Sequence, residues 1–394
     1  MITRALLFLL LAPACLLAAP YTESAKGLPP PVPVFQAGES NIPYFRIPTI
    51  ERSAKGTLLA FAEARYLDDD HARNDIVLKR STDGGKTWGP LQIIHANPEL
   101  VMVNPSPLAL GDGRILLLYE TFPHGYHARN GKHKGVTYVM MNEGFGEHTQ
   151  QLLLRTSDDD GKSWSEPVEL QTITRKDPGI IQSGSPTNGL ELKYGQHKGR
   201  ILFPLFLCKK LDAKRRSILN AVLYSDDGGK QWQLSDYVSA AETGDCNECL
   251  ISETDAGHVV MNARAGRNPR RAISRSTDGG TSWSPFRFSE HLMNRPCNAG
   301  LLKFSSANEG QGAKSRTFFS YNNSTQNRAN GFLAMSPDDG KTWPTKISLV
   351  PGYFGYSQLV KIDPSHVGVL YEPFESPKQK WSIYFLPVSL KHIQ

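Results

Sequence analysis

Hydrophobic residues in this chain come in short runs rather than in long helical periods. Runs of aliphatic and aromatic residues recur at 76–80, 115–119, 201–205 and 367–371. Such runs, bounded by turn-forming residues, are typical of short β-strands. No long segment with a period of about 3.6 residues competes with them. The pattern therefore predicts an all-β protein.

An eight-residue motif interrupts these runs at five places, which we call the Asp boxes. Each copy has Ser first, Asp third, Gly fifth and Trp eighth, at 81–88, 157–164, 225–232, 276–283 and 336–343. The Asp can accept hydrogen bonds from the amides of a hairpin turn, and the Gly can adopt the positive φ that the turn requires. Five of the six tryptophans lie in the boxes, which indicates a structural role for them rather than ligand binding.

The spacing of the boxes predicts the number of repeats. Successive boxes begin 76, 68, 51 and 60 residues apart. A four-stranded propeller blade takes about 40 to 50 residues, so each interval fits one blade with variable loops. Dividing the roughly 350 residues after the leader by about 60 gives close to six blades. We therefore expect a six-bladed β-propeller of four-stranded antiparallel blades over residues 41–394, with one blade lacking a clear box.

The first 19 residues resemble a secretory signal peptide. A short segment carrying Arg4 precedes two apolar runs, which is the usual layout of such a leader. A membrane span would need about 20 unbroken apolar residues, and Pro13 and Pro20 interrupt this stretch. We therefore expect residues 1–19 to be a signal peptide and expect no stable membrane insertion.

The leader predicts export, and one alternative concerns how it is processed. A lipoprotein anchor on Cys15 is that alternative, but residues 11–14 before it fit the motif poorly. We favour cleavage near Ala18 or Ala19, which makes the protein secreted or periplasmic. Residues 20–40, rich in proline, then form a linker into the first blade.

The charge of the chain excludes one class of partner. The formal net charge is +6, or +5 without the arginine of the leader. No run of Lys and Arg of the kind that binds nucleic acid is present, so the basic balance does not predict DNA or RNA binding. It does suit an anionic small substrate.

Four cysteines follow the leader. The spacing of Cys246 and Cys249 could suit zinc or redox chemistry, but a second pair at ligand spacing and a histidine cluster are missing. We therefore expect no metal and no cofactor. In an exported protein disulfides are the favoured interpretation. The four cysteines, which include Cys208 and Cys297, could form disulfides in three different combinations, and the sequence does not decide between them.

An arginine between apolar strand residues introduces the chemistry. Arg46 lies within Phe-Arg-Ile-Pro at 45–48, where a guanidinium is either paired in the core or directed into a central cavity. This motif, followed by several Asp boxes, resembles the sialidase (neuraminidase) family. The resemblance covers nearly all of the mature chain, from about residue 41 to residue 390. It implies an exo-α-sialidase that acts on sialylated glycoproteins, glycolipids and oligosaccharides.

The resemblance assigns three arginines to the carboxylate of the substrate. They are Arg46, Arg264 and Arg328, and Glu372 resembles the family acid that holds the first of them in place. Three guanidinium forks converging on one carboxylate are physically sensible, because the two groups match in bidentate geometry. Nearby arginines compete for these positions, although surface roles are favoured for them: Arg267, Arg270, Arg271 and Arg316.

The resemblance also assigns the nucleophile. Tyr356 lies in a segment like the family's Tyr-Ser-Asp-Leu, with Gln358 in place of the Asp, and Glu248 matches the acid that takes the phenol proton. Sialidases with a tyrosine nucleophile are exceptions among glycosidases, which mostly use two carboxylates. A carboxylate would be repelled by the substrate's own carboxylate, whereas a phenol arrives neutral. Since the free phenol has a pKa of about 10, it needs an adjacent base.

The acid/base residue is assigned to an acidic loop. Asp70 aligns best with the family's aspartate on a mobile loop, and Asp68 and Asp69 remain alternatives. Its task is to protonate the leaving oxygen and then to activate water. Arg65 resembles a family arginine that contacts the O4 side of the sugar.

Other pocket positions rest on weaker resemblance. Asn104 and Asn298 match positions that touch the sugar in animal members, although a turn and a surface amide explain them equally well. Where those members have two tyrosines near the glycerol chain, this sequence has Phe206 and Cys208. The fine specificity therefore departs from theirs.

The implied reaction is retaining hydrolysis of terminal α-linked sialic acids through a covalent tyrosyl intermediate. A trans-sialidase or a 2-keto-3-deoxynononate hydrolase would keep the same residues. A non-catalytic glycan-binding propeller would share the boxes, but it would have no reason to keep the arginines, Glu248 and Tyr356 together. Linkage preference and oligomeric state are left open by the sequence.

Overall fold

The computed structural model describes residues 24–133, 136–175, 177, 179–212, 215–240, 243–266, 268–294, 296–373 and 381–393. The expected signal peptide at 1–19 and the alternative anchor at Cys15 lie outside the described residues. Within the described part of the chain, no helix is long and apolar enough to cross a membrane.

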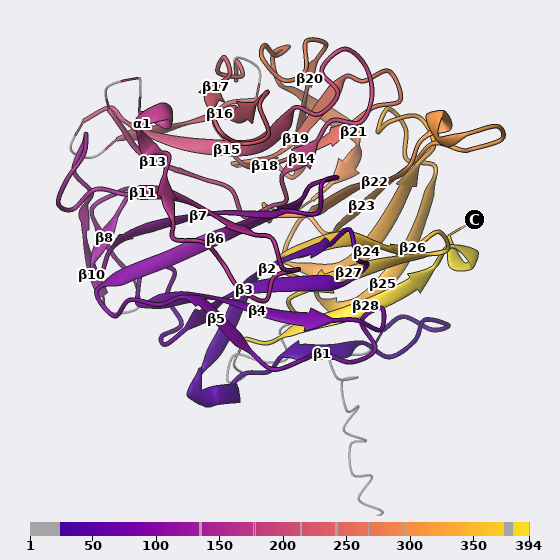
Figure 1. Cartoon of the computed structure of the whole chain (residues 1–394), viewed down its shortest axis with the longest axis horizontal. Helices are drawn as coiled ribbons and strands as arrows, with labels where there is room; N and C mark the ends of the chain where they lie inside the picture. Colours follow the sequence, from indigo (N-terminus) through magenta and orange to yellow (C-terminus); the bar gives the residue numbers. More distant parts are fainter. Residues whose placement is uncertain are drawn as a thin grey trace, which may run out of the picture.

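Six antiparallel blades follow one another around the molecule in chain order (Figure 1), as the boxes predicted. The first two blades consist of β2(Tyr44–Arg52), β3(Leu58–Arg65), β4(Asn74–Ser81) and β5(Gln92–His95), then β6(Leu100–Ala109), β7(Ile115–Pro123), β11(Gln151–Ser157) and β12(Val168–Glu169). The third and fourth consist of β13(Ile180–Gly184), β15(Ile201–Lys210), β16(Arg216–Ser225) and β17(Gln233–Leu234), then β18(Cys246–Glu253), β19(Val259–Ala265), β20(Arg270–Ser276) and β21(Arg287–Met293). The fifth and sixth consist of β22(Gly300–Ser305), β23(Arg316–Asn322), β24(Ala329–Ser336) and β25(Thr345–Tyr353), then β26(Ser357–Asp363), β27(His366–Tyr371), β28(Ile383–Ser389) and β1(Val32–Phe35).

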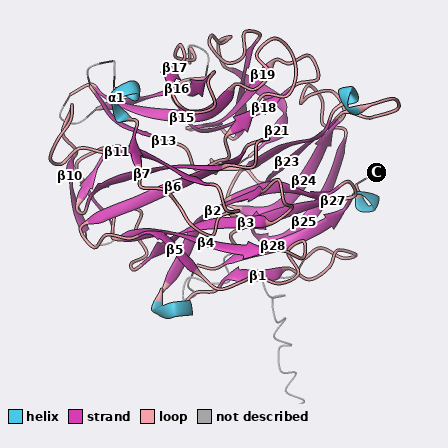
Figure 2. Cartoon of the chain, viewed as in Figure 1, coloured by secondary structure: helices cyan, strands magenta, loops and turns pink. Residues whose placement is uncertain are grey.

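A few elements lie outside this plan. Blade three carries an extra short strand, β14(Leu190–Glu191), and blade two carries an insertion with β8(Tyr126–His127), β9(Gly131–His133) and β10(Val136–Met140). The first two blades also share one parallel pairing, between Asn74 and Val101. Helical turns are short and lie at the periphery (Figure 2): η1(Glu39–Asn41), α1(Gln171–Thr174), η2(Ala307–Glu309) and η3(Leu390–His392).

The sixth blade joins the two ends of the chain. Its outer strand β1 comes from the N-terminal side and pairs with β28, with Val32 opposite Phe385. This corrects the expectation of a linker over 20–40, because Val32–Phe35 belongs to the propeller. Each Asp box occupies the turn between the third and fourth strands of a blade. The sixth blade has no such turn, since β28 and β1 are not consecutive, and this explains its missing box.

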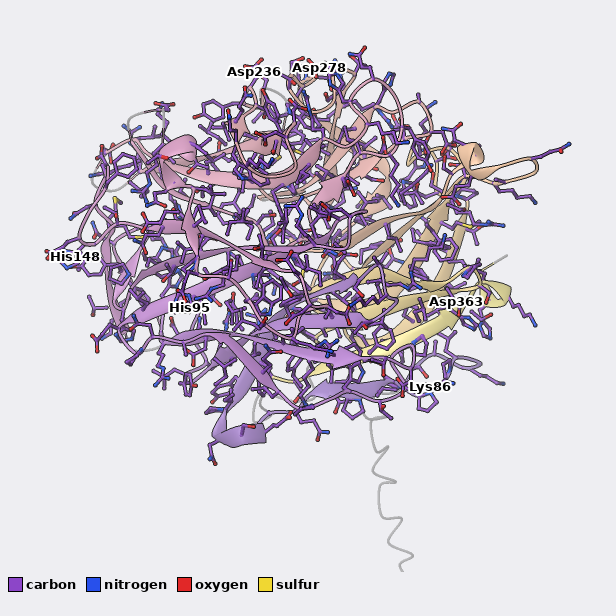
Figure 3. The ribbon with its side chains drawn as sticks, in the orientation of Figure 1. Lys86, His95, His148, Asp236, Asp278 and Asp363 are labelled. Carbon is purple, nitrogen blue, oxygen red and sulfur yellow. The ribbon has the colours of Figure 1, made fainter. Side chains whose placement is uncertain are left out.

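The first box shows how the motif closes a turn. The Ser81 hydroxyl donates to Asp83 Oδ1 (2.8 Å) and accepts from the Gly85 amide (2.9 Å). The other Asp83 oxygen accepts from the Thr87 hydroxyl (2.6 Å). The boxes lie at the outer edge of the molecule, where Lys86 and Asp278 point outward (Figure 3). The boxes are thus locally satisfied turns.

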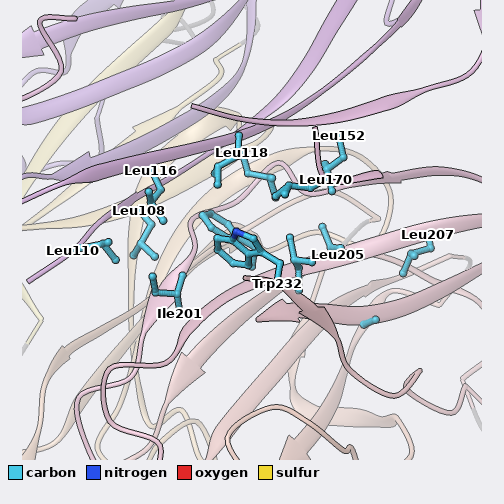
Figure 4. Packing of buried hydrophobic residues seen from close by; sticks show 14 of the residues in the cluster. Leu108, Leu110, Leu116, Leu118, Leu152, Leu170, Ile201, Leu205, Leu207 and Trp232 are labelled. Atoms are coloured by element: carbon cyan, nitrogen blue, oxygen red, sulfur yellow. The ribbon is translucent and has the colours of Figure 1, made fainter. Parts of the chain in front are cut away.

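The box tryptophans pack between neighbouring blades. Trp88 meets Phe385 of the sixth blade at a ring distance of 5.5 Å, and Trp164 meets Phe61 of the first blade at 5.9 Å. Trp232 lies in a cluster with leucines of the second and third blades (Figure 4). Burial of these large rings stabilises the contact between blades through the hydrophobic effect.

The four described cysteines form no disulfide, which corrects the expectation for an exported protein. Cys208, Cys246, Cys249 and Cys297 are all free and buried. Cys208 and Cys297 pack in two separate apolar clusters. Cys246 and Cys249 both lie on strand β18 and pack in a third cluster. The thiols therefore act as small apolar side chains of the core.

Candidate active site

A cavity of ≈ 280 Å³ is lined by residues from all six blades. Eight of the catalytic and substrate-binding residues predicted from the sequence line it, although they are spread over more than 300 positions: Arg46, Arg65, Asp70, Asn104, Glu248, Arg264, Arg328 and Tyr356. The propeller thus brings together residues that no local structure could join. Within the described residues, no group of three or more His, Cys, Asp and Glu side chains is placed to hold a metal ion.

Arg46 is fixed by a buried carboxylate beneath the cavity. Its Nε and Nη2 donate to the two oxygens of Glu372 at 3.2 and 2.9 Å. Glu372 is fully buried and also accepts from the amides of Ile47 (2.7 Å) and Tyr356 (3.2 Å). A side chain at Gly355 would clash with this carboxylate. Glu372 therefore ties the first blade to the sixth.

The backbone at Ile47 is strained. Its φ is +56°, a left-handed conformation that is a genuine outlier for a β-branched residue. The register of β2 against β3 shifts at this point, between Arg46 and Thr49. Such strain persists only where its surroundings enforce it and is commonly found at functional sites. Here it accompanies the turning of the Ile47 amide towards Glu372.

Tyr356 lies at the centre of a polar cluster. Its hydroxyl donates to Glu248 Oε1 and accepts from Arg264 Nη1 at 3.0 Å. The same Arg264 nitrogen is 2.9 Å from Glu248 Oε2, and the guanidinium of Arg328 lies over the tyrosine ring at 5.3 Å. Burial, and then the negative charge of Glu248, raise the pKa of Tyr356 well above its ordinary value, although both arginines oppose this. The free protein therefore holds a neutral phenol that donates a hydrogen bond to a carboxylate.

Of the three acids in the loop after β3, Asp70 is the one that lines the cavity. Arg65 Nη1 donates to its Oδ1 at 2.5 Å, and Arg46 Nη1 lies 3.6 Å from the same oxygen. Asp68 instead accepts from Trp381 (3.0 Å), and Asp69 is buried and accepts from an amide of its own loop (2.8 Å).

The charge state of Asp70 is set by its arginines. Partial loss of hydration at the cavity wall acts to raise its pKa, but the charges of Arg65 and Arg46 outweigh this effect and hold the pKa well below its usual range. Its side chain is 58% exposed, so it borders the open part of the cavity. In the free site Asp70 is an anion that lies within ion-pair distance of the first arginine.

A buried carboxyl pair, absent from the sequence predictions, supports the floor of the cavity. Glu63 accepts hydrogen bonds from Arg65 Nε (2.8 Å) and from the backbone amide of Asn104 (2.9 Å). Glu120 accepts from the side chains of Asn104 and Gln182, and burial raises its pKa to about 8. The one available sequence signal was that Glu63 and Arg65, two apart on a strand, share a face.

Asn298 is not brought to the cavity. Its side chain is buried and donates to the Pro186 carbonyl at 2.7 Å. Of the competing arginines, Arg270, Arg271 and Arg316 do not line the cavity. Arg271, expected at the surface, is instead buried, where it donates to Asn262 Oδ1 (2.6 Å) and the Cys297 carbonyl (3.0 Å). Arg316 reaches Ser305 and Arg270 is exposed, whereas Arg267 lies outside the described residues.

Two stacked histidines connect the acidic loop to the insertion of blade two. His71, next to Asp70, stacks on His127 of the blade-two insertion with ring centroids 3.5 Å apart. Tyr138 and Phe122 pack around His71 at 5.2 and 5.6 Å. Burial lowers the pKa of His71 to about 4 and that of His127 to about 2, so both rings are neutral near pH 7. The sequence carried no signal for this contact, because it joins distant segments.

Known proteins resemble this chain over most of its length. A family model described as a BNR repeat-like domain matches residues 56–369. The chain is 32% identical over 359 residues to a sialidase of Bacteroides fragilis, covering 86% of this chain and 62% of that protein. It is 30% identical over 352 residues to a sialidase of Micromonospora viridifaciens, covering 85% and 51%. The chain therefore spans little more than half the length of these relatives.

Solved structures show the same fold. The Hadza microbial sialidase Hz136 superposes with a TM-score of 0.76 at 26% identity, over 92% of this chain and 69% of that one. The intramolecular trans-sialidase from Ruminococcus gnavus, solved with oseltamivir carboxylate, superposes with a TM-score of 0.75 at 19% identity, over 92% and 98%.

Proposed function

Because the chain belongs to the BNR repeat-like domain family and is similar to bacterial sialidases, we propose that it is an exo-α-sialidase. It removes terminal α-linked sialic acids from glycoproteins, glycolipids and oligosaccharides, with retention of configuration. The proposed catalytic residues are Asp70, Glu248 and Tyr356. Following the leader, the proposed location is secreted or periplasmic.

The observation that carries the proposal is the convergence of three arginines on the Tyr356 ring. Arg46 and Arg328 lie over the ring at 5.5 and 5.3 Å, and Arg264 reaches its hydroxyl at 3.0 Å. A carboxylate bound by these guanidinium groups would lie next to the phenol oxygen. This geometry suits a sugar whose anomeric carbon carries both the carboxylate and the bond to be cleaved.

The first step follows from the hydrogen bond that the Tyr356 hydroxyl donates to Glu248. As the phenol oxygen attacks the anomeric carbon, its proton passes to Glu248, so the nucleophile approaches the substrate carboxylate uncharged. Arg264 then stabilises the charge that develops on the phenol oxygen. The glycosidic bond breaks, and its oxygen takes a proton from Asp70.

Asp70 must be protonated to act as the acid, but in the free site its low pKa keeps it ionised. A substrate carboxylate bound to Arg46 neutralises one of the two charges that depress the pKa of Asp70, so binding raises this pKa. In the second step the resulting carboxylate of Asp70 removes a proton from water, which attacks the anomeric carbon and releases the sugar from Tyr356. The oxygen of Tyr356 recovers its proton from Glu248.

The purified protein can be tested on a fluorogenic aryl sialoside, with a carboxylate-bearing transition-state mimic as inhibitor. We expect turnover that the mimic inhibits competitively. An absence of turnover under conditions where the protein is folded would reject the enzymatic function and leave a glycan-binding propeller.

A second outcome concerns the acceptor. The similarity to an intramolecular trans-sialidase is at 19% identity and shows the fold alone, so water is our proposed acceptor. Product analysis with added lactose measures this directly. Free sialic acid as the main product supports hydrolysis, whereas sialyllactose or an anhydro sugar as the main product contradicts it.

A further inference from the structure

The two buried glutamates under the cavity differ in how their charge is balanced. Glu63 forms an ion pair with Arg65 at 2.5 Å. Glu120 is fully buried on β7, and among the described residues no lysine or arginine forms an ion pair with it. A buried carboxylate without a cation is costly, so such a group is expected to be neutral or to be held by hydrogen bonds.

The hydrogen bonds of Glu120 come from two side-chain amides that line the cavity. Its Oε1 accepts from Asn104, and its Oε2 accepts from Gln182 at 2.9 Å. Asn104 lies on β6 and Gln182 on β13, and both belong to the cavity lining. Glu120 lies behind them and is not part of this lining. Any influence of Glu120 on a bound sugar therefore passes through these two amides.

The fold reserves space for this carboxyl group at Gly184. A Cβ atom there would lie within 3 Å of three side-chain atoms of Glu120. Gly184 is not among the glycines with positive φ, so this position requires glycine for space rather than for its conformation. The third blade thus leaves room for a carboxyl group of the second blade.

Glu120 is neutral near pH 7. Burial raises its pKa to about 8, although hydrogen bonds from Asn104 and Gln182 oppose this, and the charge of Glu63 raises the pKa further. Cys208 also interacts electrostatically with Glu120, but burial raises the pKa of this thiol to about 12. Between pH 7 and pH 9, Glu120 is therefore the group of this cluster that gains a charge.

A bound sialic acid would favour the neutral form of Glu120. The substrate carries a carboxylate, and its ring would exclude water from the floor of the cavity. Both effects disfavour a negative charge beneath the sugar. By linkage, binding should weaken as the pH rises through the pKa of Glu120 in the free protein.

We propose that Glu120 is a positioning residue of the sialidase reaction, which orients Asn104 and Gln182 for binding the uncharged groups of the sugar. This inference rests on the proposed sialidase function. A neutral carboxyl group both donates and accepts, so it can bind one amide at its oxygen and the other at its NH2 group. An ionised carboxylate only accepts and turns both NH2 groups towards itself. Ionisation thus changes which groups the two amides present to the sugar.

The test is the pH dependence of kcat/KM on sialyllactose for the wild type and for Glu120→Gln, which keeps the shape but cannot ionise. The measured quantity is kcat/KM of the wild type divided by that of the variant. Titrations that both proteins share, including that of Asp70, cancel in this quotient. For a group with a pKa of about 8, the quotient should fall about tenfold from pH 7 to pH 9. The fall should come from KM, because kcat reports on the complex, in which Glu120 stays neutral to higher pH.

Two further variants control the experiment. Glu253→Gln replaces another buried glutamate, which accepts from two backbone amides at 2.8 Å and lines a different cavity. The quotient of the wild type and this variant should stay constant from pH 7 to pH 9. Gln182→Met removes one of the hydrogen bonds that lower the pKa of Glu120, so its own loss of kcat/KM should begin at a higher pH. This variant tests the proposal even if Glu120→Gln does not fold.

Each outcome has a definite reading. A quotient for Glu120→Gln that stays constant, or that falls through kcat alone, overturns the role of Glu120. So does an equal fall for Glu253→Gln, or an alkaline midpoint of Gln182→Met that is not higher than that of the wild type. If the folded wild-type protein cleaves no sialoside at any pH, the proposed function is rejected instead.

Discussion

The Asp boxes and the central cavity both depend on carboxylate side chains, but in the boxes the carboxylate binds residues of its own turn, and in the cavity it binds residues of distant segments. In the first box, the Asp83 carboxylate is bonded by Ser81 and Thr87 of its own turn. In the cavity, Glu372 joins residues from two blades that are 326 positions apart. The boxes repeat and are locally satisfied, whereas the cavity is unique, strained at Ile47 and rich in positive charge. Repeated features therefore specify the fold, and the departures from repetition specify the site.

The largest expected effect is the loss of activity when Tyr356 of the cavity is substituted. Tyr356→Phe removes the nucleophilic oxygen and should lower kcat on an aryl sialoside by on the order of 10³-fold or more. Tyr194→Phe is the matched control, because Tyr194 lines a second cavity of ≈ 290 Å³ that contains none of the catalytic residues. Circular dichroism should show both variants folded. Comparable activity of Tyr356→Phe and the control would contradict the assignment.

The next effect concerns the buried carboxylate under Arg46. Glu372→Gln removes a fully buried charge with four recorded hydrogen bonds, so the free energy of unfolding should fall by about 3 to 5 kcal/mol. Arg46 would then turn towards Asp70, and KM should rise. Urea denaturation and steady-state kinetics measure both quantities.

The control for this variant lies on the same strand. Glu51→Gln changes the other end of β2, where burial raises the pKa of Glu51 to about 7, so removing this charge should cost little. Equal stability of the two glutamine variants would show that Glu372 does not tie the blades together.

A smaller effect tests the histidine contact above Asp70. His127→Ala removes the ring on which His71 stacks and should loosen the acidic loop. We expect kcat/KM to fall about tenfold on sialyllactose, since general acid catalysis contributes about 10²–10⁴-fold and is only partly lost. The loss should be smaller on an aryl sialoside, whose leaving group needs little protonation. An equal loss on both substrates would indicate a general structural defect.

The smallest effect belongs to the boxes. Hydrogen bonds lower the pKa of Asp83 and Asp159 to about 2, as they do for Asp278 against the opposing effect of burial. Because these folded-state values lie below the ordinary 3.8, the stabilisation is complete above about pH 4 and is lost as the pH falls towards 2.

Asn substitution of these three residues should lower Tm at pH 7 and flatten the fall in Tm between pH 4 and 2. Activity on an aryl sialoside should be unchanged at a temperature where the protein is folded. A fall in Tm with the same slope as the wild type would show that the box carboxylates do not cause the acid sensitivity.

The sequence predicted what is local or repeated. Five boxes were enough for the six blades, but the closing strand β1 was missed, because the proline-rich segment at 20–40 suggested a linker and the pairing partner is more than 340 residues away. Proline is tolerated in β1 because this strand lies at the edge of its sheet.

The site was predicted as far as the family motifs extend. They named Arg46, Glu248 and Tyr356, which all line the cavity, but they did not name Glu63 and His127, whose positions depend on contacts between segments. Arg271 was expected at the surface because arginine is seldom buried. Its two hydrogen-bond acceptors, Asn262 and the Cys297 carbonyl, come close to it only in the folded chain, where β19 pairs with β20.

The central claim is that Tyr356 forms a covalent bond to the sugar. A sialosyl fluoride with a second fluorine on the neighbouring carbon reacts with the nucleophile but is released slowly, so the adduct can be identified by peptide mass spectrometry. We predict one sialyl adduct, on Tyr356, which disappears in Tyr356→Phe. An active protein whose adduct lies on another residue, or which forms no adduct while the reagent inactivates it, would contradict the account.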